Sequence, residues 1–437
     1  MRLRPLFLAL PLAWASAVRA DTVQASSTTL LLARQDFRDG SLLTAVPLYQ
    51  LLNLDASDVK TPFARFEVAL STWGAVDLAD VRFWQNGAPS GDRFTGDVSV
   101  GFVRAELLDR RLTLTLGRQM VTDGNARQVQ IDGANGRVEL PMGFGLSGYV
   151  GVPVAPRFAA RGGSFGVATV NATLASGGRL FWHRPGLLEI GTSVAWATDR
   201  GAPARQDIGF DVRITPLRKL SLTGAAFWSI YAGRLGEAVV AATYSPLRNL
   251  DVSADYRRVE PDLFLPLNSI LSVFASEKRN DFGGAVHWAA LRQLALDADY
   301  HVLLEDNGTT GHWAKVKGTY YLHGPATAVG TELSILRNST ASPVIVGNGY
   351  QEVRLFGTHR ILPNLVGTAD FMAYFFDHPV NAETHSISGT ATLAYEFARG
   401  WRAALAGTAG STPFLSRQLE LMAKLVYEQT YAVREVK

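Results

Sequence analysis

The sequence predicts an all-β fold, a transmembrane antiparallel up-and-down β-barrel of about 18 strands, within a range of roughly 16 to 20. Three observations predict it. Apolar and polar residues alternate with period two over long segments, and similar short turn motifs recur between these segments. After residue 20, no stretch reaches the ~18 consecutive apolar residues that a membrane helix needs. Together these features favour strands, rather than helices, as the membrane-crossing elements.

The first 20 residues have the layout of a secretory signal peptide. Arg2 and Arg4 precede an apolar run, which ends in the small-residue pattern Val18-Arg19-Ala20. The alternative, an N-terminal membrane anchor, is disfavoured because about 14 apolar residues are too few to span a bilayer. Without this segment the chain keeps 39 of its 42 basic residues against 39 acidic ones. A neutral mature chain gives no support to a nucleic-acid partner.

Composition narrows the class further. The chain has no cysteine, so disulfides and thiolate metal sites are excluded. Only 19% of residues are charged, while 10% are aromatic and 41 residues are glycine. A soluble exported protein of this size usually carries more charge. These values fit a barrel with one face in lipid.

The alternation places an apolar side chain at every second position of segments such as 207–214, 250–257, 293–302 and 419–428. Successive side chains of a strand point to opposite faces, so one face is apolar and the other largely polar. A soluble β-sandwich would also alternate. Strands of ~10–13 residues, aromatic residues near strand ends, and short turns that alternate with longer loops favour the membrane barrel.

Recurring turns set the expected strands. The motifs at 216–220 (PLRKL), 246–250 (PLRNL) and 290–294 (ALRQL) resemble one another, with looser versions at 362–365 and 398–401. We expect strands near 63–75, 94–107, 111–119, 178–184, 187–198, 205–215, 219–230, 235–245, 249–259, 281–290, 293–304, 311–321, 326–337, 349–361, 364–376, 384–397, 400–409 and 416–430. Residues 62–437 thus form the barrel, after a periplasmic segment or first strand at 21–61 to which 28–37 could add a strand.

The segment 121–177 is the least regular, with glycine at positions 133, 136, 143, 145, 148 and 151. About 55 residues between two strands exceeds an ordinary loop. Two interpretations stay open. The segment is a long surface loop that hides a strand pair, or it is inserted into the lumen as a constriction.

The signal peptide, turns and alternating strands resemble the porin-like outer-membrane barrels of Gram-negative bacteria and, less specifically, barrels proposed for exopolysaccharide export. The resemblance implies an outer-membrane location and passage of polar solutes or saccharides, by passive diffusion or as the exit pore of polysaccharide export. The implied partners are outer-membrane lipid, the barrel-assembly machinery, and periplasmic export partners that would meet Arg218, Arg248 and Arg292 at the turns. One departure is the C-terminal Lys437, where many such barrels have an aromatic residue.

Charged residues at the inward positions are the candidate lumen lining. Acids and bases interleave among them, which predicts mutual pairing and weak ion selectivity. Asp251, Asp255, Asp297 and Asp299 could form an acidic strip, relieved by neighbouring cations such as Arg213, Arg257 or Lys315. The candidates are Asp207, Asp211, Arg213, Asp251, Asp255, Arg257, Asp297, Asp299, Lys315, Lys317, Glu352, Arg354, Glu420 and Lys424. Three candidate inward aromatic residues, which could stack on sugar rings, are Phe227, Tyr350 and Phe356.

The sequence gives little support for metal binding or catalysis. The eight histidines do not fall at metal-ligand spacings, and no H-E-x-x-H or G-x-S-x-G motif occurs. We therefore predict no catalytic residue, no metal and no cofactor. A TonB-dependent transporter is disfavoured because roughly 40 mature residues before the first clear strand are too few for a plug. The remaining alternative is an enzyme or ligand-binding barrel with its site at the outer rim and no open channel.

Overall fold

The structure is a computed structural model. It describes residues 19–38, 41–79, 84–85, 88–89, 94–122, 124, 128–154, 174–199, 201–264, 278–322, 324, 326–338 and 349–432. Within these residues no helix is long and apolar enough to cross a membrane.

Almost all of the described chain is β-strand, apart from two short 3-10 helices, Pro141–Gly143 and Pro261–Phe264. The strands of the first half are β1 (Arg19–Arg38), β2 (Ser41–Ala45), β3 (Pro47–Lys60), β4 (Ala64–Asp77), β5 (Trp84–Gln85), β6 (Ala88–Pro89), β7 (Phe94–Leu107), β8 (Leu112–Val121), β9 (Val129–Glu139), β10 (Phe144–Pro153), β11 (Leu174–Arg184), β12 (Leu188–Asp199) and β13 (Ala202–Leu217). Those of the second half are β14 (Leu220–Ser229), β15 (Arg234–Leu247), β16 (Leu250–Val259), β17 (Arg279–Leu291), β18 (Leu294–Glu305), β19 (Thr310–Tyr321), β20 (Thr327–Asn338), β21 (Tyr350–Leu362), β22 (Leu365–Val380), β23 (Glu383–Ala398), β24 (Trp401–Thr412) and β25 (Leu415–Ala432).

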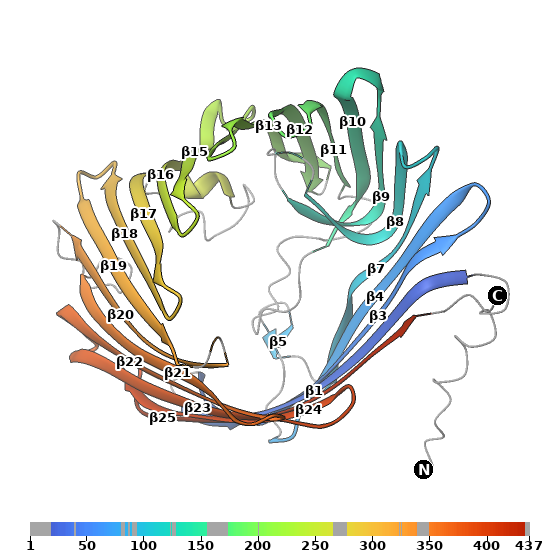
Figure 1. Cartoon of the computed structure of the whole chain (residues 1–437). Coiled ribbons are helices and arrows are strands. Elements are labelled where there is room, and N and C mark those ends of the chain that lie inside the picture. Colours follow the sequence, from blue (N-terminus) through green and yellow to red (C-terminus); the bar gives the residue numbers. More distant parts are fainter. Residues whose placement is uncertain are drawn as a thin grey trace, which may run out of the picture.

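These strands close into an antiparallel barrel (Figure 1). Each barrel strand pairs with its neighbour in sequence, and β1 pairs with β25 from Thr22↔Ala432 to Ala33↔Leu421, which completes the ring. The short strand β2 extends β1 as a hairpin, and β5 pairs only with β6. Closure satisfies the backbone of every wall strand without leaving an edge, the condition for a sheet that crosses lipid.

The barrel has 22 strands, so the expectation of about 18 is wrong. The eighteen expected strands are present, with ends that mostly agree within a few residues. The four additional strands are β1, which includes the segment 28–37 that could add a strand, and β3, β9 and β10. In β1 and β3 the period-two pattern is interrupted by polar pairs such as Thr29 and Gln50, whose side chains form a 2.7 Å hydrogen bond. A bulge between Ala56 and Val59, where Asp58 has φ 55°, further obscures the alternation of β3.

Strands β9 and β10 lie inside the segment 121–177. Their glycines are strand positions: Gly148 pairs with Gly136 on one side and with Gly178 on the other. The strand pair that the first interpretation left open is therefore present. Residues 155–173, the rest of the region between β10 and β11, lie outside the described residues, so insertion of that part into the lumen stays a prediction.

One end of the barrel carries only short connections, whereas the opposite end carries both short ones, such as 381–382, and long ones. At the first end no connection exceeds five residues, and the turns Arg218-Lys219, Arg248-Asn249 and Arg292-Gln293 have only two. Their leucine neighbours pair directly across each turn, as in Leu217↔Leu220. The long connections, such as 260–278 and 339–349, lie at the opposite end. This asymmetry is typical of outer-membrane barrels.

The two faces of the wall differ in chemistry. Large apolar side chains on the outer face are exposed, with Val316 at 55%, Leu355 at 51% and Leu405 at 65%. The alternate side chains, which point inward, include most of the ion pairs. A closed antiparallel barrel with an apolar outside and a charged inside is the architecture of porin-like outer-membrane proteins, as the sequence resemblance implies.

Candidate functional site: the inner wall of the barrel

The strand register places the fourteen charged candidates on one face of the wall, opposite the exposed apolar side chains. Direct partners share a face, and the pairs Asp297↔Lys317 and Asp299↔Lys315 show this for two of the candidate acids. Asp255 and Arg257 lie on the same face as their direct partners on β17, Gly283 and Asp281. Their assignment as the lining of a conducting pore remains a proposal.

One row of charged side chains crosses six neighbouring strands, from β16 to β21, with acids and bases in alternation. Its members are successive direct partners: Asp251, His287, Asp297, Lys317, Glu332 and Arg354. His287 Nδ1 lies 2.5 Å from Asp297 Oδ1, and Arg354 pairs with Asp370 of β22. We name this set the charged row. Because its charges are of both signs, it can accept and donate hydrogen bonds along its whole length.

The four aspartates do not form the uninterrupted acidic strip that we considered. Asp251 and Asp297 lie on either side of His287, and Lys315 Nζ lies 3.0 Å from an Asp299 carboxylate oxygen. Of the three cations expected to relieve the strip, Lys315 does so. Arg257 instead binds Glu237 at 2.7 Å.

A cluster of one arginine and two carboxylates, on β11–β13, contains only one residue that the sequence analysis had selected. Arg179 of β11 donates to Glu189 of β12 at 2.9 Å and to Asp211 of β13, whose Oδ1 lies 3.2 Å from Arg179 Nε. The Arg179 side chain is only 7% exposed. Only Asp211 was a candidate, although Arg179 and Glu189 both lie within strands that the sequence predicts, at 178–184 and 187–198. A guanidinium that binds two carboxylates joins the three neighbouring strands β11, β12 and β13 through charge-assisted hydrogen bonds.

Aromatic rings on the inner face cover glycines of the neighbouring strand. A Cβ added to any of these glycines would overlap or crowd the ring, so the ring occupies the space of the missing side chain. The pairs are Phe181 on Gly145, Tyr149 on Gly177, Phe227 on Gly236, His301 on Gly283 and Phe356 on Gly330. Of the three aromatic candidates, Phe227 and Phe356 thus pack onto the wall. Phe227 is 2% exposed.

The inner face is covered on one side of the barrel and open on the other. On β8–β14 many inward side chains are buried: Thr115, Gln119, Val121, Ile131, Ser147, Ala175, Arg179, Phe181, Ser193, Ala195, Asp207, Phe227 and Ser229. The connection between β8 and β9 contributes, since a Cβ on Gly124 would lie 2.6 Å from Ser193 Cβ. On β16–β22 most inward side chains, including Lys317, Tyr350 and Arg354, are half-buried or exposed. The inner wall of β16–β22 is therefore accessible from the lumen.

Within the described ranges, no group of three or more His, Asp or Glu side chains is placed to hold a metal ion. His287 and His301 each contact one aspartate, Asp297 and Asp281, at 2.5 and 2.8 Å. Such pairs orient the imidazole ring and keep charge on the wall.

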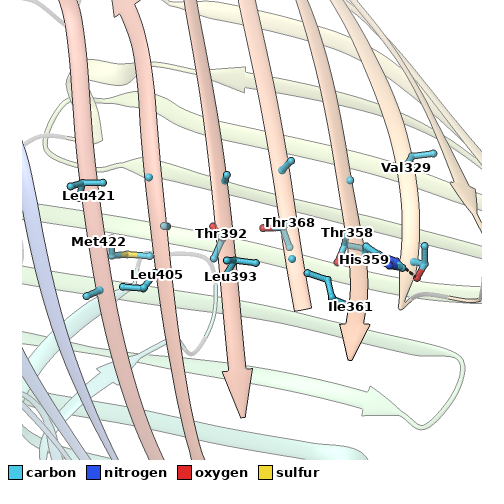
Figure 2. A pocket seen from close by; sticks show the side chains of 18 of the residues that line it. Val329, Thr358, His359, Ile361, Thr368, Thr392, Leu393, Leu405, Leu421 and Met422 are labelled. Carbon is cyan, nitrogen blue, oxygen red and sulfur yellow. Dashed lines mark hydrogen bonds between the residues drawn. The ribbon is translucent and has the colours of Figure 1, made fainter. Parts of the chain in front are cut away.

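The outer face carries a shallow apolar groove of about 1170 Å³ across β20–β25 and β1. Figure 2 shows Val329 of β20 at one side of the groove and Leu393, Leu405 and Leu421 of β23, β24 and β25 at the other. Glycine and alanine contribute much of its lining, and Thr327 and His359 are joined by a 3.1 Å hydrogen bond near one end. Its lining matches the rest of the lipid-type outer face, so it gives no evidence for a polar substrate.

No protein-family profile matches the sequence, and no curated protein matches it. Among solved structures, OccAB4 of Acinetobacter baumannii is similar with a TM-score of 0.48 and 10% identity, over 95% of this chain and 99% of that one. OccK8 (OprE) of Pseudomonas aeruginosa has a TM-score of 0.45 and 11% identity, over 94% and 98%. The outer membrane protein opdK of P. aeruginosa gives 0.45 and 10%, over 94% and 99%. With TM-scores below 0.5, these likenesses assign neither a family nor a substrate.

Proposed function

We propose that this chain is an outer-membrane channel through which polar solutes diffuse passively. The observation that carries the proposal is the two-faced closed wall. Its outer face exposes leucines, valines and aromatic rings, while its inner face carries acids and bases that interleave around an accessible surface. The apolar outer surface is compatible with contact with lipid, and the charged inner surface is compatible with contact with water.

The turn end of the barrel is assigned to the periplasm, because short turns and both chain ends of bacterial barrels lie there. Arg218, Arg248 and Arg292 are exposed at this end. They suit the phosphate groups of the periplasmic lipid leaflet. Contacts with assembly machinery are part of the proposal, whereas polysaccharide export is not.

Single-channel recording tests the proposal. We expect the refolded chain to give stable ohmic current steps in a planar bilayer, with weak preference between cations and anions. A second variant replaces residues 155–173 with a short Gly-Ser linker and leaves β10 and β11 intact. Larger steps in this variant would support insertion of that segment into the lumen. Silence in both proteins, with folding verified by circular dichroism, would contradict the channel and favour a closed barrel with a rim site.

The lipid-facing assignment makes a separate prediction. Leu355 lies halfway along β21 and is 51% exposed on the outer face. Leu355→Arg should lower the free energy of unfolding in lipid vesicles by about 2 kcal/mol, because a cation in the hydrocarbon core is unfavourable. Thr358→Arg, on the inner face of the same strand, is the matched control and should cost much less. Equal losses in urea unfolding would show that Leu355 does not face lipid.

A further inference from the structure

A row of mainly aromatic side chains runs beside the charged row on the open part of the inner wall. Its members are successive direct partners across β18–β22: His301, Trp313, Leu336, Tyr350 and Phe376. We name this set the aromatic row. It lies on the side of the charged row nearer the long connections, and Tyr374 of β22 adjoins it. All of these side chains are half-buried, so part of each ring remains accessible.

Neighbouring groups hold the rings in place. The Trp313 indole N–H donates to Ser334 Oγ at 3.1 Å, and the Trp313 ring centroid lies 5.3 Å from that of His301. On the other side, Tyr350 meets Tyr374 edge to face at 5.6 Å. Tyr374 in turn stacks parallel to Phe376 at 6.4 Å. Rings fixed in this way lose little conformational freedom when a ligand binds.

The aromatic row, together with the adjoining Tyr374, forms two separate clusters of rings. Trp313 and His301 form one, and Tyr350, Tyr374 and Phe376 form the other. Strand β20, with Leu336 and the small Ser334, lies between them. Two strand spacings put Trp313 and Tyr350 about 10 Å apart. This is roughly the length of two linked sugar rings.

The charges next to the rings select against charged ligands. Lys315 Nζ already lies 5.3 Å from the Trp313 ring centre, where a cationic ligand would bind. An anionic ligand would meet Glu352, which lies beside Tyr374, and Glu332 on β20. An uncharged, hydroxyl-rich ring meets neither obstacle. Its hydroxyls can accept from Lys315 and donate to Glu352, while its apolar face covers an aromatic ring.

We propose that the aromatic row, together with Lys315 and Glu352, is a binding site for uncharged oligosaccharides inside the channel. The inference rests on the proposed channel function and specifies its substrate class. A contiguous group of partly exposed aromatic rings is typical of a ligand-binding surface. The combination of stacked rings with both donors and acceptors fits a saccharide better than an ion.

Sugar-induced block of single-channel current tests the site. The probes are three uncharged hexasaccharides of different linkage: maltohexaose, cellohexaose and chitohexaose. At least one should reduce the current through the wild-type channel in a saturable manner. Trp313→Ala and Tyr350→Ala should each raise its half-blocking concentration roughly tenfold, because each removes one stacking surface. Trp228→Ala, which removes an indole from the outer face of β14, is the matched control and should leave block unchanged.

The outcomes separate the two proposals. Ohmic conductance without block by any of the three sugars would overturn the saccharide site and leave the channel intact. Stronger block by spermidine or citrate than by the sugars would also overturn it, because the site would then select charge. Block that persists in both inner-wall variants would place the sugar elsewhere. Absence of any conductance would contradict the channel itself.

Discussion

Replacing Gly133 with valine is expected to lower the free energy of unfolding by about 3 kcal/mol or more, or to prevent barrel assembly. Gly133 of β9 faces Gly151 of β10 in the ladder. A Cβ on Gly133 would overlap the Val150 carbonyl oxygen and lie 2.5 Å from Gly151 Cα. These are backbone atoms of a paired strand, so no side-chain rotation relieves the overlap. The strands must separate or the register must shift.

Heat-modifiable mobility in gels and urea unfolding measure the effect. Gly133→Ala should show a smaller loss in the same direction, because one methyl group already reaches the opposing backbone. Gly389 of β23 is the matched control: a Cβ there has nothing within 4 Å, and its φ is not positive. Gly389→Val should be nearly neutral, since valine suits a strand. If Gly133→Val unfolds like this control, the close approach of β9 and β10 is wrong.

The same two strands show where sequence reasoning fails in this protein. From β12 to β25, alternation and the leucine-flanked turns located the strands to within a few residues, because each turn and each apolar face gives a separate signal. In β10, Gly145 leaves space that the Phe181 ring of β11 covers, and Tyr149 of β10 in turn covers Gly177 of β11. The complementarity between ring and glycine involves two neighbouring strands, so it is not visible in the sequence of either strand alone. A single strand then resembles a loop.

For the inner wall, the sequence predicted which face each charged residue is on but not which partner it has. Period two determined which charged residues share the inner face, because parity alone sets the face of a strand residue. Partners could not be derived, since they depend on register between strands. Arg257 pairs with Glu237 rather than with the aspartates, and Asp211 pairs with Arg179, which was not among the candidates. Phe356 was correctly expected on the inner face, but its ring packs over Gly330 of the neighbouring strand.

Arg179→Met is expected to destabilise the barrel by about 3 kcal/mol, the second large effect in this wall. Methionine keeps much of the side-chain length but removes the guanidinium. The carboxylates of Glu189 and Asp211 then face each other without their shared cation. Their repulsion acts on the inner face of β11–β13, where the Glu189 and Asp211 side chains are 41% and 21% exposed, so water screens it in part. Urea unfolding in vesicles measures the loss.

Two further variants identify its cause. Arg213→Met, on β13, removes an exposed inward cation for which the described part of the chain shows no ion pair, and it should change stability by less than about 0.5 kcal/mol. Adding Glu189→Gln and Asp211→Asn to Arg179→Met should recover much of the loss, because the uncompensated charges are then gone. If the triple variant is no more stable than Arg179→Met alone, the loss comes from packing of the arginine stem against the Phe181 ring. If Arg213→Met is equally harmful, the wall responds to its total charge, and the three-residue cluster has no special role in joining β11, β12 and β13.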